Sequence, residues 1–274
     1  MPEMPEVEII RRSLVNKLIN KQITNLEVLL PRLIKWPSAT NFQAMIIGRT
    51  ITDMKRRGKY LLVYLDNSNI IVIHLRMTGR LCYVSPDMNR DAYTRIAFHL
   101  DNGDVLVYAD TRTLGTLYAL GEDEIWRISG LANMGPEPLS EEFTVEYLQA
   151  VLANSRSKIK SFLLNQKYIG GLGNIYVDEC LIISKIHPER SCNEIKDHEV
   201  IHLHAAINKV IGEGIKDGGT TFRDYRDGNG DKGSHQQNLL AYGRTGLPCQ
   251  FCGTAIEKIE VGGRGTHFCP HCQH

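Results

Sequence analysis

The alternation of hydrophobic and polar positions predicts one helix followed by many short strands in the first half of the chain. Apolar residues recur at helical spacing at Val7, Ile10, Leu14 and Leu18, with basic residues at Arg11, Arg12 and Lys17. The pattern then becomes that of β-strands, over residues 23–30, 60–65, 70–75, 96–100, 105–108 and 116–120. One helix ahead of so many short strands favours a two-layer β-sandwich or a flattened barrel.

The second half of the chain has the periodicity of helices. A proline-containing linker at 136–140 precedes predicted helices near 143–153, 157–164 and 194–216. Glycines crowd a turn at 170–173, and Asn174 is placed to cap the helix that follows. Glycines and charges dominate residues 218–233, which favours either a mobile surface loop that closes over a substrate or a plain connection.

Four cysteines near the C-terminus have the spacing of a metal site. Cys249 and Cys252 form one Cys-x-x-Cys pair, and Cys269 and Cys272 form a second pair after sixteen intervening residues. Four thiolates at this separation suit one tetrahedral zinc ion, with two disulfides or chance as the alternatives. The glycines at 262–265 predict the turn of a hairpin between the pairs. Three histidines are possible substitute ligands: His267, His271 and His274.

The composition is that of an ordinary globular protein with room for two domains. The chain has 274 residues, of which 42% are hydrophobic and 23% charged. No apolar run approaches the ~20 residues that span a bilayer, and no secretory signal opens the chain. Unpaired thiols at Cys82, Cys180 and Cys192 suit a reducing cytosol. Because the net charge is only +1, a nucleic-acid partner would need a local basic patch.

The first residues offer a candidate nucleophile. Pro2 is small enough to permit removal of Met1, which would expose a secondary amine. An α-amino group titrates near pH ~8, so part of it is neutral and nucleophilic at pH 7. Glu3 and Glu6 could supply a general acid or base beside it. The alternative is a frayed terminus whose proline and acidic residues open a helix, and these residues alone favour that alternative.

Three stretches of the first half combine basic residues with apolar ones: residues 55–59, 74–80 and 110–115. Cations hold phosphates, and apolar tips such as Met77 and Leu114 fill the gap when a base leaves the stack. Taken singly, each stretch is better explained as a solvated turn with an apolar residue in the core. The turn before Asn174 could likewise receive an anion at a helix N-terminus or simply pack two helices.

Together these stretches resemble the bacterial formamidopyrimidine-DNA glycosylase family, which includes the endonuclease VIII-like enzymes. The resemblance covers essentially the whole chain. Its motifs are Pro2-Glu3-x-Pro5-Glu6-Val7-Glu8, Arg57-Gly58-Lys59, His74-Leu75-Arg76-Met77, Gly171-Leu172-Gly173-Asn174-Ile175-Tyr176, Gly243-Arg244 and Gly263-Arg264-Gly265-Thr266. Met4 is more typical of the formamidopyrimidine branch. The implied α+β fold has an N-terminal catalytic β-sandwich domain with flanking helices (1–134), a helical helix–two-turns–helix domain with a lesion-capping loop (135–240), and a zinc ribbon that ends in a zinc-bound β-hairpin (241–274).

The resemblance also implies a chemistry. Pro2 would attack C1′ of a damaged nucleotide and form a Schiff base that permits β- and δ-elimination. Glu3 would donate and shuttle protons, and Lys59 would contact a phosphate or assist the reaction. Arg264 is grouped with them as a phosphate ligand beside the lesion. The implied activity is a DNA glycosylase and abasic-site lyase for oxidised purines.

Further residues would hold the DNA. The resemblance assigns phosphate contacts to His74, Lys160, Asn174 and Arg264. Met77 and Arg112, with Leu114 on the same loop, would enter the space left by the flipped nucleotide. The implied partner is double-stranded DNA with a damaged base or abasic site. The implied cofactor is one structural Zn²⁺ per chain. We expect the protein to be a monomer. We expect it in the cytoplasm, associated with the nucleoid when it is bound to DNA.

Three departures from the family's pattern concern lesion search and recognition. Thr113-Leu114 stands where many members have Lys-Phe, Thr78 where several have Glu, and His235 where Phe is usual. The excision residues match, so the chemistry is more firmly implied than the lesion. Two alternatives therefore stay open: a paralogue with another lesion range, such as oxidised pyrimidines, and a DNA-binding relative without catalysis. Intact Pro2, Glu3 and Lys59 argue against the second.

Overall fold

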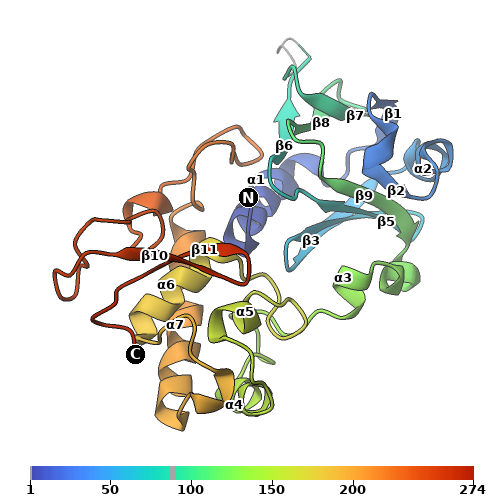
Figure 1. Cartoon of the computed structure of the whole chain (residues 1–274). Coiled ribbons are helices and arrows are strands. Elements are labelled where there is room, and N and C mark those ends of the chain that lie inside the picture. The colour runs from blue at the N-terminus through green and yellow to red at the C-terminus, as the bar shows by residue number, and fades with distance from the viewer. Residues whose placement is uncertain (1, 87–90) are drawn as a thin grey trace. The chain divides into compact units, whose positions relative to one another are not determined.

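A computed structural model describes residues 2–86 and 91–274 (Figure 1). The chain folds into two compact units. The first contains the chain up to Ala132 together with Asp217–Ser234, and the second contains Asn133–Lys216 and His235–His274. The segment Asp217–Ser234 thus belongs with the N-terminal unit, although it follows the helices of the second unit in sequence. The three-part division at 134 and 240 stays a prediction.

The described residues of the first unit form two sheets and three α-helices. The four-stranded sheet has the order β1-β7-β8-β6, and the five-stranded sheet has the order β2-β9-β5-β4-β3. All neighbours are antiparallel except β2 and β9. The strands are β1 (Ile23–Val28), β2 (Ile34–Trp36), β3 (Ile51–Arg57), β4 (Tyr60–Leu65), β5 (Asn69–His74), β6 (Gly79–Val84), β7 (Thr94–Leu100), β8 (Val105–Asp110) and β9 (Thr116–Gly121). The helices are α1 (Met4–Leu18), α2 (Ala39–Ile46) and α3 (Ser129–Ala132).

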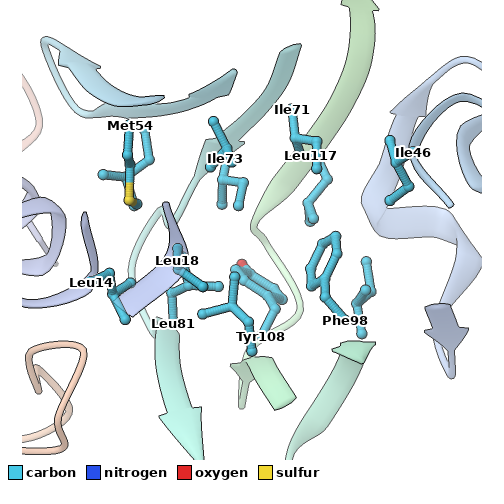
Figure 2. Packing of buried hydrophobic residues seen from close by; sticks show 14 of the residues in the cluster. Leu14, Leu18, Ile46, Met54, Ile71, Ile73, Leu81, Phe98, Tyr108 and Leu117 are labelled. Carbon is cyan, nitrogen blue, oxygen red and sulfur yellow. The ribbon is translucent and has the colours of Figure 1, made fainter. Parts of the chain in front are cut away.

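The core of this unit lies between the two sheets. Figure 2 shows Ile71, Ile73 and Leu117 of the five-stranded sheet facing Leu81, Phe98 and Tyr108 of the four-stranded one. Each of these side chains is at most 2% exposed. Leu14 and Leu18 of α1 join the same cluster, so the helix is anchored in the sandwich. The predicted β-sandwich with flanking helices is confirmed.

An ionic cluster fixes α1 against β3. The Glu8 carboxylate accepts hydrogen bonds from Arg11 and Arg12 on its own helix and from Nε of Arg56 on β3 at 3.3 Å. Burial raises the pKa of Glu8, but these arginines outweigh burial and lower it to about 2. The carboxylate is therefore ionised at neutral pH, and it ties the first two turns of α1 to the sheet.

The second unit contains four α-helices and a hairpin. They are α4 (Val145–Ala153), α5 (Ile159–Leu163), α6 (Asn174–Ser184), α7 (Asp197–Lys216), β10 (Glu257–Val261) and β11 (Arg264–Phe268). Val261 pairs with Arg264, so Gly262 and Gly263 form the two-residue turn. Both have positive φ (58° and 73°), as the predicted hairpin turn requires. Among the helices that the structure describes, none is both long and apolar enough to cross a lipid bilayer.

The sequence patterns missed several elements. Residues 55–57 were expected in a turn but lie on β3, where only Ile51 and Met54 face the core. Strand β6 was not predicted, nor was helix α2, which buries only Phe42 and Ile46. Short elements with two or three buried positions give too weak a period to be recognised.

The segment 217–234 differs from the expected mobile surface loop, because it packs closely against α1. Tyr225 is only 6% exposed and belongs to the sandwich core. The Gly228 N–H donates to Ser13 Oγ at 2.9 Å, and the Gly228 carbonyl accepts from the Tyr83 N–H at 2.9 Å. A Cβ on Gly228 would come within 2.4 Å of Leu14, so only glycine fits this approach. The polar composition concealed these few anchoring residues.

We expect Phe98→Ala to destabilise the first unit by about 3–5 kcal/mol, because it empties the space between the two sheets. Urea unfolding followed by circular dichroism measures the loss. The control is Leu29→Ala, since Leu29 is 60% exposed and should change stability by less than about 0.5 kcal/mol. Equal unfolding midpoints for Phe98→Ala and the unsubstituted protein would contradict the assigned core.

Candidate functional site

The start of the chain is held by one carboxylate. Pro2 and Glu3 are buried at the N-terminal end of α1, where Glu3 is 1% exposed. The Glu3 N–H donates to Glu6 Oε2 at 2.8 Å, and the Thr220 N–H donates to Glu6 Oε1 at 2.7 Å. Glu6 therefore joins the residue next to Pro2 to the segment 217–234. Sequence reasoning noticed Glu6 only as a possible acid or base, because its distant partner Thr220 left no local signal.

Lys59 and His74 lie at one end of the five-stranded sheet. Lys59 lies in the β3–β4 turn and is 9% exposed, and its neighbour Tyr60 pairs with His74 on β5. Burial, together with the charges of Arg76 and Lys59, lowers the pKa of His74 to about 3. The imidazole is therefore neutral at pH 7.

The tautomer of His74 follows from its backbone partner. Nδ1 of His74 accepts a hydrogen bond from the Arg76 N–H at 3.0 Å. In a neutral ring the proton then resides on Nε2. His74 is thus arranged to donate one hydrogen bond to an anion, without contributing a charge of its own.

Met77, Arg112 and Leu114 are exposed to solvent. Met77 is 39% and Leu114 45% exposed, so the alternative that they pack in the core is wrong. The structure brings two of them together, since Arg112 Nη1 lies 3.1 Å from Met77 Sδ. An apolar tip beside a guanidinium suits a surface that displaces stacked bases.

A buried aspartate shapes the loop that carries Arg112 and Leu114. Asp110 is fully buried and accepts hydrogen bonds from the Thr78 hydroxyl at 2.6 Å and from the Gly115 N–H at 2.9 Å. The Arg112 N–H donates to both Thr78 Oγ1 and Asp110 Oδ1. Thr78 therefore points into the protein, where it fixes the loop. Sequence reasoning missed Asp110 because one aspartate at a strand end is common.

In the second unit, a buried ion pair holds the hairpin. Lys160 and Asp178 have fully buried side chains, and Lys160 Nζ lies 2.6 Å from Asp178 Oδ1. Asp178 Oδ2 accepts from the N–H of His267 on β11 at 2.9 Å and lies 3.1 Å from its Nδ1. Sequence reasoning did not single out Asp178, which links α5, α6 and β11.

The same network reaches the carbonyl group beside Arg264. Lys160 Nζ donates to the Gly265 carbonyl at 3.1 Å, and Asn174 Nδ2 donates to it at 2.9 Å. The cap of α6 is Gly173 rather than Asn174, so Asn174 uses its side chain to contact the hairpin. Arg264 itself is exposed at the start of β11. The arrangement therefore orients Arg264, while direct phosphate contacts by Lys160 and Asn174 stay a prediction.

The Glu179 carboxylate fixes the segment that leads into the zinc ribbon. Glu179 is 3% exposed and accepts hydrogen bonds from the N–H groups of Leu240, Ala241 and Tyr242 at 2.6–2.9 Å. Burial raises the pKa of Glu179, and the three N–H groups oppose that change. His235 is 3% exposed and stacks on Tyr176 at 5.6 Å, so it packs inside the second unit.

The four predicted zinc ligands converge. The Sγ atoms of Cys249, Cys252, Cys269 and Cys272 all lie within 4.8 Å of one another. A tetrahedral ion with Zn–S bonds of ~2.3 Å needs sulfur atoms about 3.8 Å apart, so the set fits. His267 is directed to Asp178, which excludes it from this ligand set. The zinc ribbon, which contains the hairpin, therefore binds one structural zinc ion.

Comparison with known proteins matches the whole chain to one family. The family described as "Formamidopyrimidine-DNA glycosylase N-terminal domain" matches residues 1–117. The family described as "Formamidopyrimidine-DNA glycosylase H2TH domain" matches residues 134–226. "Zinc finger found in FPG and IleRS" matches residues 246–274.

Individual relatives and structures agree. The formamidopyrimidine-DNA glycosylase of Desulforamulus reducens is 46% identical over 100% of this chain and 99% of its own, and that of Symbiobacterium thermophilum is 45% identical over 100% and 89%. The Lactococcus lactis Fpg bound to DNA containing an abasic site superposes with a TM-score of 0.94 at 37% identity, with full coverage of both chains. The chain therefore belongs to the formamidopyrimidine-DNA glycosylase family.

Proposed function

We propose that this protein removes oxidised purines from double-stranded DNA and then cuts the strand at the abasic site. The buried chain start, with Glu6 holding Glu3 beside Pro2, is the observation that carries the proposal. Relatives named formamidopyrimidine-DNA glycosylase and a Lactococcus lactis complex with DNA containing Fapy-dG support the same substrate class. Formamidopyrimidine and 8-oxoguanine are the proposed lesions.

The first step requires the amine of Pro2, free of Met1, which lies outside the described residues. The Pro2 nitrogen attacks C1′ of the flipped nucleotide, and the electron pair of the N-glycosidic bond leaves with the base. Glu3 donates the proton that the departing base requires. Opening of the sugar ring gives an iminium that joins Pro2 to C1′.

The iminium then permits strand cleavage. It acidifies the C2′ proton, and loss of this proton expels the 3′ phosphate by β-elimination. A second elimination expels the 5′ phosphate. Water finally hydrolyses the Schiff base and restores the amine. Glu3 moves protons in these steps, and its backbone bond to Glu6 keeps the chain start in place.

We propose separate tasks for the DNA-binding residues. His74 donates one neutral hydrogen bond to a phosphate, while Lys59 and Arg264 contribute charge. Met77 and Arg112 enter the space left by the flipped nucleotide, and Leu114 fills less of it than a phenylalanine would. Lys160 and Asn174 position the hairpin through the Gly265 carbonyl. We propose that they also contact a phosphate beside the lesion.

A paralogue with another lesion range is the second candidate function. The observation that supports it is the orientation of Thr78. The Thr78 hydroxyl donates a hydrogen bond to the buried Asp110 carboxylate, so the side chain points into the protein. Leu114 adds a smaller tip at an exposed position. Excision rates on duplexes with 8-oxoguanine, formamidopyrimidine or dihydrouracil decide between the candidates.

We also propose that the protein acts as a monomer in the cytoplasm and associates with the nucleoid when it binds DNA.

We expect Pro2→Gln to abolish covalent trapping by borohydride on a duplex with an abasic site. The long second residue blocks removal of the initiator methionine, so the amine is displaced from its position. Gel electrophoresis of the reduced protein–DNA adduct measures the effect. The matched control is Pro31→Gln at an exposed position, which should trap as the unsubstituted protein does. Adduct from Pro2→Gln in normal yield would exclude Pro2 as the nucleophile.

Zinc removal should weaken DNA binding before it affects the reactive amine. Cys249→Ser is expected to lose the metal and to weaken binding of an abasic-site analogue about tenfold or more. Without the ordered hairpin, Arg264 loses its proposed charge-assisted hydrogen bond to a phosphate. Such a hydrogen bond contributes about 1.5–3 kcal/mol to the free energy of binding. Fluorescence anisotropy measures the affinity, and metal analysis should find about one zinc per unsubstituted chain.

The matched control for this experiment is Cys82→Ser, because Cys82 lies outside the four-cysteine cluster. It should retain both zinc and affinity. A zinc-free Cys249→Ser protein with unchanged affinity for the duplex would contradict the role assigned to the ribbon.

A further inference from the structure

The only two tryptophans of the chain lie exposed at one pocket of the first unit. Trp36 is 47% and Trp126 62% exposed. Both line a pocket of about 370 Å³, a volume that holds one or two large side chains. Neither belongs to the proposed catalytic or DNA-binding residues. Two exposed indoles at one hollow are unusual, since large aromatic side chains normally bury most of their surface.

One guanidinium connects the two rings. Arg127 Cζ lies 5.3 Å from the centre of the Trp36 ring and 5.2 Å from that of the Trp126 ring. Such cation–π contacts are attractive, so they favour one arrangement of the three side chains. The aromatic walls are therefore partly organised before any partner arrives, which lowers the entropic cost of binding.

The floor and the charge of the pocket define its partner. Leu120 and Ile128 are 1% and 4% exposed and give the pocket an aliphatic floor. Its charged lining residues are Lys35 and Arg127, both cations. Glu124 pairs with Arg127 Nε at 2.8 Å but does not line the pocket. An acidic ligand with a large apolar group complements this surface.

Three features favour a peptide over nucleic acid as the occupant. Trp36 belongs to β2, the edge strand of the five-stranded sheet, which pairs only with β9 among the described strands. Edge strands accept extended peptides through their backbone groups. The aliphatic floor also suits a branched or aromatic side chain better than a polar base edge. Tryptophan and arginine, moreover, are the residue types that dominate binding energy at protein interfaces.

We propose that this pocket is a docking site for an acidic, extended segment of a partner protein that carries one large apolar side chain. The apolar side chain enters between the indoles and rests on the aliphatic floor. Its flanking carboxylates face Lys35 and Arg127. The site would recruit a partner to the enzyme without occupying the proposed catalytic residues.

Tryptophan fluorescence tests the proposal directly, because all tryptophan emission of the chain comes from this pocket. The probe is the synthetic peptide acetyl-Asp-Asp-Phe-Asp-Asp-amide, titrated into the full-length protein. We expect a saturable change in emission with a Kd of roughly 10 µM to 1 mM, typical of one anchored side chain. Replacing Phe by Ala, or every Asp by Asn, should remove the saturable change. Raising the salt concentration should weaken binding.

Variants locate the contact. Arg127→Gln should weaken peptide binding at least about fivefold, because it removes one of the two cations that face the peptide carboxylates. Arg49→Gln is the matched control, because Arg49 is an exposed arginine of the same unit outside the pocket, and it should bind normally. Circular dichroism of both variants verifies folding.

Three outcomes would overturn the proposal. The first is the absence of a saturable change with the Asp-Asp-Phe-Asp-Asp peptide. The second is equal binding of the Asn-substituted or Ala-substituted peptide. The third is stronger binding by a short oligothymidylate, which would assign the pocket to single-stranded nucleic acid instead.

Discussion

The reaction centre proposed for this protein depends on the carboxylate of Glu6. A nucleophile at a chain terminus has no covalent restraint on one side, so its position must come from contacts. Glu6 accepts the Glu3 N–H with one oxygen and the Thr220 N–H with the other. The first turn of α1 and the segment 217–234 are thereby joined at one anion. Glu8 then holds the next turn to β3 through Arg56. Placement of the amine thus rests on two carboxylates that take no part in the proposed chemical steps.

In the second unit, contacts with buried groups likewise fix the position of Arg264. A hairpin with a two-residue glycine turn is flexible by itself, yet a phosphate contact needs a fixed guanidinium. Two of the zinc ligands precede β10 and two follow β11, so the metal would hold the open end of the hairpin. The Lys160–Asp178 pair holds β11 through His267 and the Gly265 carbonyl. Buried ion pairs add little net stability, but they penalise arrangements that leave either charge unpaired. The pair therefore selects one position of the hairpin.

Much of this fold was predictable from the sequence. The predictions that failed did so for physical reasons. The repeating apolar residues of α1 and the spacing of the four cysteines carry their information locally. The partners of Glu6, Asp110 and Asp178 lie far away in sequence, so no local pattern marks them. The segment 217–234 looked mobile because its anchors are Tyr225 and a few backbone groups. Lys160, expected to bind phosphate, has its ammonium group buried beside Asp178.

We propose that catalysis begins at the amine of Pro2, at the opposite end of the chain from the zinc ligands. Mass spectrometry of the borohydride-reduced adduct, after proteolysis and nuclease digestion, identifies the nitrogen that attacks C1′. We expect the deoxyribose remnant on the nitrogen of Pro2, in a peptide that lacks Met1. A remnant on Lys59 or any other lysine, or an adduct peptide that retains Met1, would contradict it.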